Sequence, residues 1–174
     1  MRRTLAAIAL ALLCAAPASA REVGEKLAPD LVLGVDRAGQ PVTAGSFSGK
    51  PVLIMFWATW CSDCAHELPV AEALQKRWGE RAVVLGISTD ASARDLKKYL
   101  RKNAHKLTFA VSHDRSGVAR SFGVREIPTN LLVDASGVVR WKRVGFDEKW
   151  LKELAEALRE LTPQQAGESA AAGS

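Results

Sequence analysis

Residues 57–64 read WATWCSDC and directly follow the apolar run VLIMF at residues 52–56. A helical pattern begins at the second cysteine, so the two cysteines lie where a buried strand meets the first turn of a helix. Two intervening residues place both sulfur atoms in that turn, close enough to form a disulfide. We interpret this stretch as a redox-active dithiol.

The two cysteines have different roles in this interpretation. Cys61 is the exposed, attacking cysteine, and Cys64 is the inner, resolving cysteine. Unpaired backbone N–H groups and the positive end of the helix dipole stabilise a thiolate at Cys61. A thiolate attacks a disulfide to give a mixed disulfide, which the second cysteine then resolves.

Two plainer interpretations of the cysteine pair remain open. A zinc site needs four ligands, usually from a second pair of cysteines, and no cysteine follows Cys64 in the chain. A static structural disulfide would close so short a loop that it would constrain the unfolded chain only weakly. The redox interpretation is favoured over both, and it requires no metal and no organic cofactor.

The first 20 residues have the features of a secretory signal peptide. Two arginines precede an apolar segment at residues 5–13, and residues 18–20 form a small-x-small cleavage pattern. The segment is shorter than the about 20 residues that span a membrane, so we expect cleavage before Arg21 and a periplasmic location. An uncut leader that acts as a membrane tether is the alternative. Cys14 lies within the leader, so both cysteines of the mature chain belong to the motif.

Length and charge exclude some classes of function. The chain has 174 residues, which fits one domain after a leader, and its formal net charge of +5 is spread along the sequence. Such a dispersed, mild excess of positive charge does not form the clustered basic patch that indicates a nucleic-acid-binding surface. We expect no nucleic-acid partner, and we expect a monomer.

The rest of the chain alternates strand and helix patterns. Apolar runs predict strands at residues 31–33, near 42, and at 52–57, 83–88, 107–112, 130–134 and 138–144. Helical spacing predicts helices from the second cysteine to residue 78, with a kink at Pro69, and over 92–103, 117–122 and 147–161. This order predicts an α/β fold with a mixed central sheet flanked by helices. Residues 162–174 show no apolar periodicity and are expected to form a disordered tail.

Three motifs at these separations resemble the thioredoxin superfamily. They are FWATWC-x-x-C at residues 56–64, Pro69 five residues after the second cysteine, and Ile127-Pro128-Thr129. With its leader, its N-terminal hairpin and its extra helix over 92–103, the chain is similar to the TlpA, ResA and CcmG group of extracytoplasmic proteins. The resemblance implies a thioredoxin-like fold over residues 21–161, with the hairpin as an N-terminal β-hairpin extension.

The resemblance also implies a substrate surface. It implies a cis peptide bond before Pro128, which packs against the dithiol and leaves the backbone of Ile127 free to pair with an extended substrate strand. Trp60 completes that surface. Without the resemblance, an ordinary trans proline in a turn would be the simpler interpretation.

The resemblance further implies an acidic residue that handles a proton. The group carries this residue three positions after the second cysteine, which is Glu67 here, whereas the buried strand aspartate of thioredoxins corresponds to Met55. Glu67 is therefore predicted to exchange a proton with Cys64 during resolution. A solvated glutamate that only complements the helix dipole is the alternative.

Asp63 stands where the family commonly has a proline. A carboxylate suits the helix dipole, but it disfavours a second negative charge on Cys61. Our hypothesis is that Asp63 raises the pKa of the Cys61 thiol and makes the pair a better reductant.

As a whole, the resemblance implies an extracytoplasmic thiol-disulfide oxidoreductase that reduces disulfides in exported proteins. Apocytochrome c is the first substrate it suggests, with a membrane protein as electron donor. A general periplasmic thiol reductase, or one that acts in the assembly of copper sites, is the next function it suggests. A copper-binding metallochaperone that uses Cys61, Cys64 and His66 is the alternative. Peroxiredoxin chemistry is disfavoured because that family's proline and threonine pattern does not precede Cys61. We otherwise expect His66 on the surface and both His105 and His113 in loops.

Overall fold

The computed structural model describes residues 21–103 and 106–161. The predicted leader, the predicted disordered tail and His105 lie outside the described residues. Within the described part of the chain, no helix is long and apolar enough to cross a membrane.

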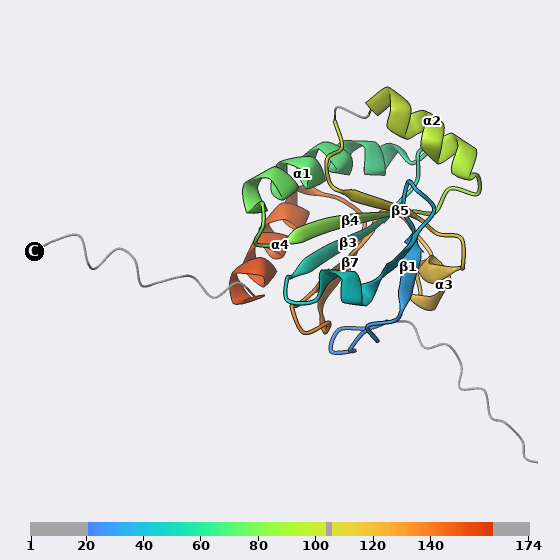
Figure 1. Ribbon diagram of the computed structural model, residues 1–174. Helices are drawn as coiled ribbons and strands as arrows, with labels where there is room; N and C mark the ends of the chain where they lie inside the picture. The colour runs from blue at the N-terminus through green and yellow to red at the C-terminus, as the bar shows by residue number, and fades with distance from the viewer. Residues whose placement is uncertain (1–20, 104–105, 162–174) are drawn as a thin grey trace, which may run out of the picture.

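Seven strands form one mixed sheet in the order β2-β1-β5-β4-β3-β6-β7 (Figure 1). The strands are β1 Val32–Val35, β2 Pro41–Thr43, β3 Val52–Trp57, β4 Val83–Ser88, β5 Ala110–His113, β6 Thr129–Val133 and β7 Val139–Val144. The helices are η1 Ala44–Phe47, a 3₁₀ helix, and α1 Ser62–Trp78, α2 Ala93–Asn103, α3 Val118–Ser121 and α4 Glu148–Leu161. The predicted mixed sheet with flanking helices is therefore confirmed.

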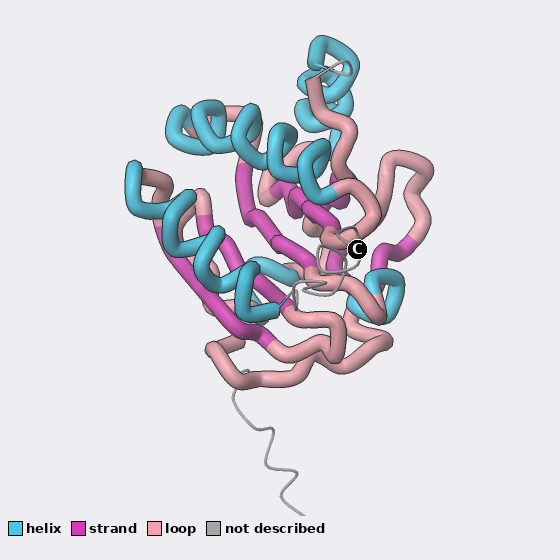
Figure 2. Tube along the Cα trace, turned by 90° about the vertical axis from the view of Figure 1, so that its left-hand side faces the viewer, coloured by secondary structure: helices cyan, strands magenta, loops and turns pink. Residues whose placement is uncertain are grey.

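Strand β3 is the centre of the sheet, and all six of its residues are buried. It pairs in parallel with β4 and in antiparallel with β6. Its side chains alternate between two core clusters, one with α1, α2 and α4 and the other with α3 and the N-terminal segment. Figure 2 shows α1 and α4 in front of the strands on one face. A strand covered on both faces has no polar side, which explains the uninterrupted apolar run.

The N-terminal extension has the predicted form. Strands β1 and β2 pair in antiparallel, and β1 joins the main sheet beside β5. This arrangement makes β2 and β7 the outer strands of the sheet. At its N-terminal end, β7 is partly covered by the segment that precedes β1, because the Gly24 N–H donates to the Val139 carbonyl at 2.8 Å.

The strand predicted at residues 107–112 is displaced. Strand β5 begins at Ala110, three residues later than predicted, and ends at His113. Before it, both the backbone N–H and the hydroxyl of Thr108 donate to the Glu72 carboxylate, each at 2.7 Å. Because this carboxylate takes the backbone donor of Thr108, the segment packs apolar side chains into the core without joining the sheet.

Strands β3 and β4 end together, because Trp57 is opposite Ser88 in the parallel register. The Trp57 indole is fully buried against Gly86 of β4, where an added Cβ would lie 2.9 Å from Nε1. A larger residue at position 86 would therefore displace the ring. The chain reaches Cys61 soon after this point, at the carboxyl edge of the parallel strands, where α/β proteins place their functional sites.

Candidate active site

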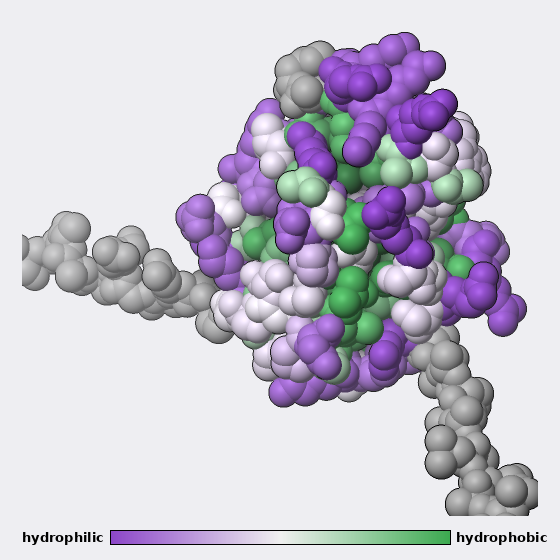
Figure 3. All heavy atoms as spheres, turned by 45° about the vertical axis from the view of Figure 1, so that its right-hand side comes forward, coloured by the Kyte–Doolittle hydropathy of each residue, from purple (hydrophilic) through white to green (hydrophobic). Residues whose placement is uncertain are grey.

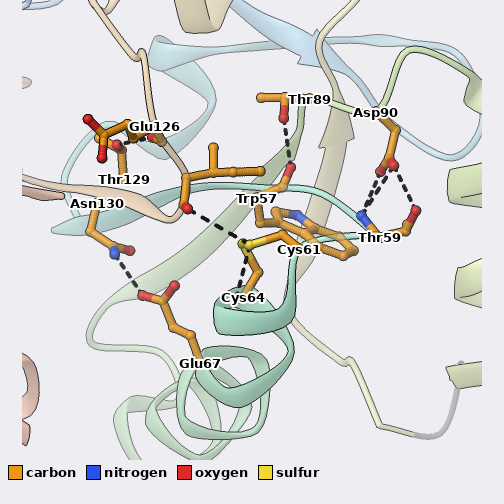
Figure 4. The surroundings of a disulfide bond; sticks show 11 residues. Trp57, Thr59, Cys61, Cys64, Glu67, Thr89, Asp90, Glu126, Thr129 and Asn130 are labelled. Atoms are coloured by element: carbon orange, nitrogen blue, oxygen red, sulfur yellow. Dashed lines mark hydrogen bonds between the residues drawn. A yellow bond between two sulfur atoms is a disulfide. The ribbon is translucent and has the colours of Figure 1, made fainter. Parts of the chain in front are cut away.

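The two cysteines form a disulfide at the start of α1, with their Cα atoms 5.2 Å apart. Cys61 is the N-cap residue of the helix, and its Sγ accepts a hydrogen bond from the Cys64 N–H at 3.1 Å (Figure 4). This N–H is one of the helix donors that have no partner within the helix itself. The same donor can stabilise a Cys61 thiolate when the disulfide is open.

The loop before β6 lies against the dithiol. The Ile127–Pro128 peptide bond is cis, and the Ile127 carbonyl oxygen lies 3.9 Å from the Cys61 Sγ. Pro128 is buried, Ile127 is half-buried, and Trp60 beside the dithiol is 72% exposed. The loop of Ile127 and Pro128 and the segment of the dithiol, which are distant in sequence, thus meet at Cys61, and Trp60 is exposed beside the dithiol.

Glu67 lies in α1 below the disulfide and is completely buried. Burial raises its pKa from 4.5 to about 8, against the opposing effect of a hydrogen bond from Asn130. The Asn130 Nδ2 donates to the Glu67 Oε1 at 2.7 Å, whereas the Glu67 Oε2 and the Asn130 Oδ1 have no partner in the described residues. The alternative of a solvated surface glutamate is therefore wrong.

Asn130 is a residue that the sequence analysis missed. It lies in β6 directly opposite Met55 of β3, so a polar side chain stands next to the position where thioredoxins carry their buried acid. Its signal in the sequence is an amide within the otherwise apolar run NLLV, residues 130–133, all of which are buried. A fully buried amide requires hydrogen-bond partners, and here the partner is Glu67.

Asp90, which was also missed, holds the loop between β3 and α1 in place. It is 4% exposed, and its carboxylate accepts hydrogen bonds from the Thr59 N–H at 3.1 Å and the Thr59 hydroxyl at 2.7 Å. The Ser88 hydroxyl donates to the same carboxylate at 2.7 Å. The sequence feature that could have indicated this role is an aspartate that closely follows the buried strand β4. These bonds fix the backbone two residues before Cys61.

The histidines partly differ from expectation. His66 is exposed on α1, as predicted. His113, however, is the last residue of β5 and only 8% exposed, so its assignment to a loop was wrong. Its Nε2–H donates to the Asp90 carbonyl at 2.7 Å, a bond that holds the ring against the core. Among residues 21–103 and 106–161, no three His, Cys, Asp or Glu side chains group as ligands for a metal ion.

Sequence comparison identifies related proteins over most of the chain. The sequence model of the AhpC/TSA family matches residues 23–142. The thioredoxin-like protein YneN of Bacillus subtilis is 34% identical over 145 residues, which cover 80% of this chain and 83% of YneN. The thiol-disulfide oxidoreductase ResA of Bacillus thuringiensis is 32% identical over 145 residues, covering 82% of this chain and 80% of ResA.

Solved structures with the same fold include two at 29% sequence identity. A candidate thiol:disulfide interchange protein DsbE from Chlorobium tepidum has a TM-score of 0.70 at 29% identity, covering 80% of this chain and 97% of its own. The exposed lipoprotein thioredoxin Etrx1 of Streptococcus pneumoniae has a TM-score of 0.60 at 29% identity, covering 77% and 99%. Both agree with the thioredoxin-like fold expected from the motifs.

Proposed function

Because this chain belongs to the AhpC/TSA family, within its thioredoxin-like branch, we propose that it reduces disulfide bonds in exported proteins. It is a thiol-disulfide oxidoreductase, and its substrates are proteins that contain disulfides. The observation that carries the proposal is the contact of the Cys61 Sγ with the Ile127 carbonyl beside a buried, protonatable Glu67.

In the first step the Cys61 thiolate attacks one sulfur of the substrate disulfide. A Cys61–substrate disulfide forms, and the other substrate sulfur leaves as a thiolate and takes up a proton. The helix N-terminus supports the attacking thiolate through the Cys64 N–H, 3.1 Å from the Cys61 Sγ in the disulfide form. The buried proline keeps the opposite wall of the site apolar.

In the second step Cys64 loses its proton and attacks the Cys61 sulfur. The mixed disulfide breaks, the second substrate sulfur leaves as a thiolate that takes up a proton from water, and the Cys61–Cys64 disulfide closes. Glu67 accepts the Cys64 proton in this proposal. The closed disulfide is the product of substrate reduction, and in this state a pKa of about 8 keeps most Glu67 side chains protonated at neutral pH. The raised pKa therefore suits a group that has just received a proton.

Substrate binding uses the surface around the dithiol. An extended substrate segment pairs with the backbone of Ile127, while the exposed Trp60 ring covers apolar side chains of the substrate. Backbone pairing gives affinity with little sequence specificity, which suits a reductase that acts on unfolded or extended chains. Apocytochrome c, with a disulfide in an unfolded chain, is the first candidate substrate.

The location and the electron source complete the proposal. The protein acts outside the cytoplasm as a monomer, and a membrane thiol reductase returns electrons to the closed disulfide. The leader pattern at residues 1–20 supports export. Similarity to Etrx1, described as an exposed lipoprotein, supports the same location.

The reduction potential of the Cys61–Cys64 pair tests the direction of electron flow. Equilibration with dithiothreitol and glutathione buffers in metal-free solution should give about −270 mV or lower, the range of thioredoxin. A value near about −120 mV would make the pair an oxidant and overturn the reductase assignment. Tight stoichiometric copper binding without disulfide exchange would instead favour the metallochaperone.

A further inference from the structure

A cavity of about 380 Å³ lies between α2, the turn after β1 and the end of β5, and neither cysteine lines it. Its apolar wall includes Leu96 and Leu100 from α2 and Val111 from β5. In Figure 3, hydrophobic atoms in green show beneath the purple side chains at the top of the molecule, where Figure 1 places α2. The volume falls within the about 300–1,000 Å³ typical of small-molecule sites.

Four cationic side chains from three segments line the same cavity and form its cationic rim. They are Arg37 from the turn after β1, Lys97 and Arg101 from α2, and Arg115 after β5. Within residues 21–103 and 106–161, none of these four side chains has an ion pair or a hydrogen bond. Like charges gathered around one opening repel each other, and a bound anion would relieve that repulsion.

One carboxylate also lines the cavity, but it is already engaged. The Asp36 Oδ1 accepts hydrogen bonds from the backbone N–H groups of Ala38 and Gln40, each at 2.8 Å. These bonds close the turn that carries Arg37. Asp36 thus shapes the edge of the cavity and leaves the rim with an excess of positive charge.

We propose that this cavity binds a small amphipathic carboxylate, with its acidic head on the cationic rim and its hydrocarbon body on the apolar wall. The carboxylate of the ligand complements the charge of the rim, and its hydrocarbon chain complements the apolar wall. An inorganic anion would leave the apolar wall in water, and a neutral hydrocarbon would leave the rim unpaired. A nucleic acid would need aromatic rings for base stacking, and no Phe, Tyr or Trp lines the cavity.

Titration of the purified, oxidised protein with decanoate tests the proposal. Calorimetry should show one saturable site, and methyl NMR shifts should concentrate on Leu96, Leu100 and Val111. Acetate has the carboxylate without the long hydrocarbon chain, and decanol has the chain without the charge. Each should therefore bind at least about tenfold more weakly than decanoate. Acetate that binds as tightly as decanoate would overturn the amphipathic ligand, and decanol that binds as tightly would overturn the role of the rim.

Charge-reversal variants on α2 distinguish a specific effect of the cationic rim from a general effect of the charge of the helix. The double variant Lys97→Glu, Arg101→Glu should weaken decanoate binding about tenfold. Lys98→Glu is the matched control, because Lys98 is exposed on the same helix but does not line the cavity, and it should change binding by less than about twofold. All three positions are exposed, so the fold should be retained, which unchanged methyl spectra elsewhere would verify. Equal weakening by Lys98→Glu, or shifts centred away from the apolar wall, would refute the site.

Discussion

Glu67 and Glu72 lie on the same helix and are both buried, with exposures of 0% and 5%, yet their chemistry differs. Burial alone acts to raise the pKa of both carboxyls. For Glu72, two hydrogen bonds from Thr108 and one from Lys76 outweigh burial and lower the pKa below 4.5. Glu67 has one hydrogen bond, from Asn130, and its pKa rises to about 8. Glu67 lies deep in the core with one partner, whereas Glu72 lies closer to the surface with several partners, so depth and hydrogen bonding together decide which acid is held neutral.

The largest expected effect is on catalysis. Glu67→Gln keeps the shape of the side chain but cannot accept a proton, so resolution of the mixed disulfide by Cys64 should slow about 100-fold. Stopped-flow measurement with a disulfide peptide at several pH values should show that the pH step assigned to Glu67 disappears. Glu72→Gln is the matched control and should change the rate by less than about twofold, since Glu72 does not contact the dithiol.

Asn130→Leu sharpens the same experiment. The change removes the donor to Glu67, so the pKa of Glu67 should rise further, and the pH step should move upward without disappearing. Equal slowing in the Glu67 and Glu72 variants would indicate a general loss of packing. In that case the distinction between the two carboxyls would fail.

The second expected effect is on stability. The pKa of Glu67 is higher in the folded than in the unfolded chain, so the folded state holds more protons between about pH 4.5 and 8. The free energy of unfolding of the oxidised protein should therefore fall by a few kcal/mol as pH rises through this window. Denaturant titrations of Glu67→Gln should show a flatter profile there.

Glu72 should behave in the opposite way. Its pKa is lowered in the folded state, so its contribution is present above pH 4.5 and is lost as pH falls below that value. Glu72→Gln should cost about 1–3 kcal/mol at neutral pH because Thr108 loses a charged acceptor. A wild-type profile that is flat from pH 5 to 9 would show that Glu67 is not held neutral.

The smallest expected effect comes from Asp63, the exposed carboxylate of the same helix. Asp63→Ala should lower the pKa of the Cys61 thiol by less than about one unit, because solvent screens the exposed charge. The reduction potential of the Cys61–Cys64 pair should rise slightly as the pKa of the Cys61 thiol falls. Thiol alkylation rates against pH measure the first quantity, with Ser62→Ala as the neighbouring control. Unchanged values in Asp63→Ala would refute our hypothesis that Asp63 makes the pair a better reductant.

Sequence alone predicted what depends on local pattern. The six buried residues of β3, the cysteines at the start of α1 and the hairpin of β1 and β2 follow from periodicity and spacing within short segments. The cis bond before Pro128 and the choice of Glu67 came from the family resemblance.

The features that the sequence did not predict depend on how segments distant in sequence align in the fold. Asn130 meets Glu67 across 63 positions of sequence because β6 pairs with β3 in one register, and no local pattern encodes that register. The displaced start of β5 has a similar origin. Glu72 and Thr108, 36 positions apart, form a contact that competes with sheet pairing for a backbone donor.

The outer strand β7 bears on how the molecule avoids aggregation. An open strand edge offers unpaired backbone groups to another copy, and charged side chains along it discourage that association. Here the edge carries Arg140, Lys142 and Arg143, each held in an ion pair with Asp134, Glu22 and Asp147, respectively. Two copies that approached edge to edge would have to desolvate or break these ion pairs. The sheet therefore ends in a charged, hydrated border, and a second strand could pair with it only after these ion pairs had lost water.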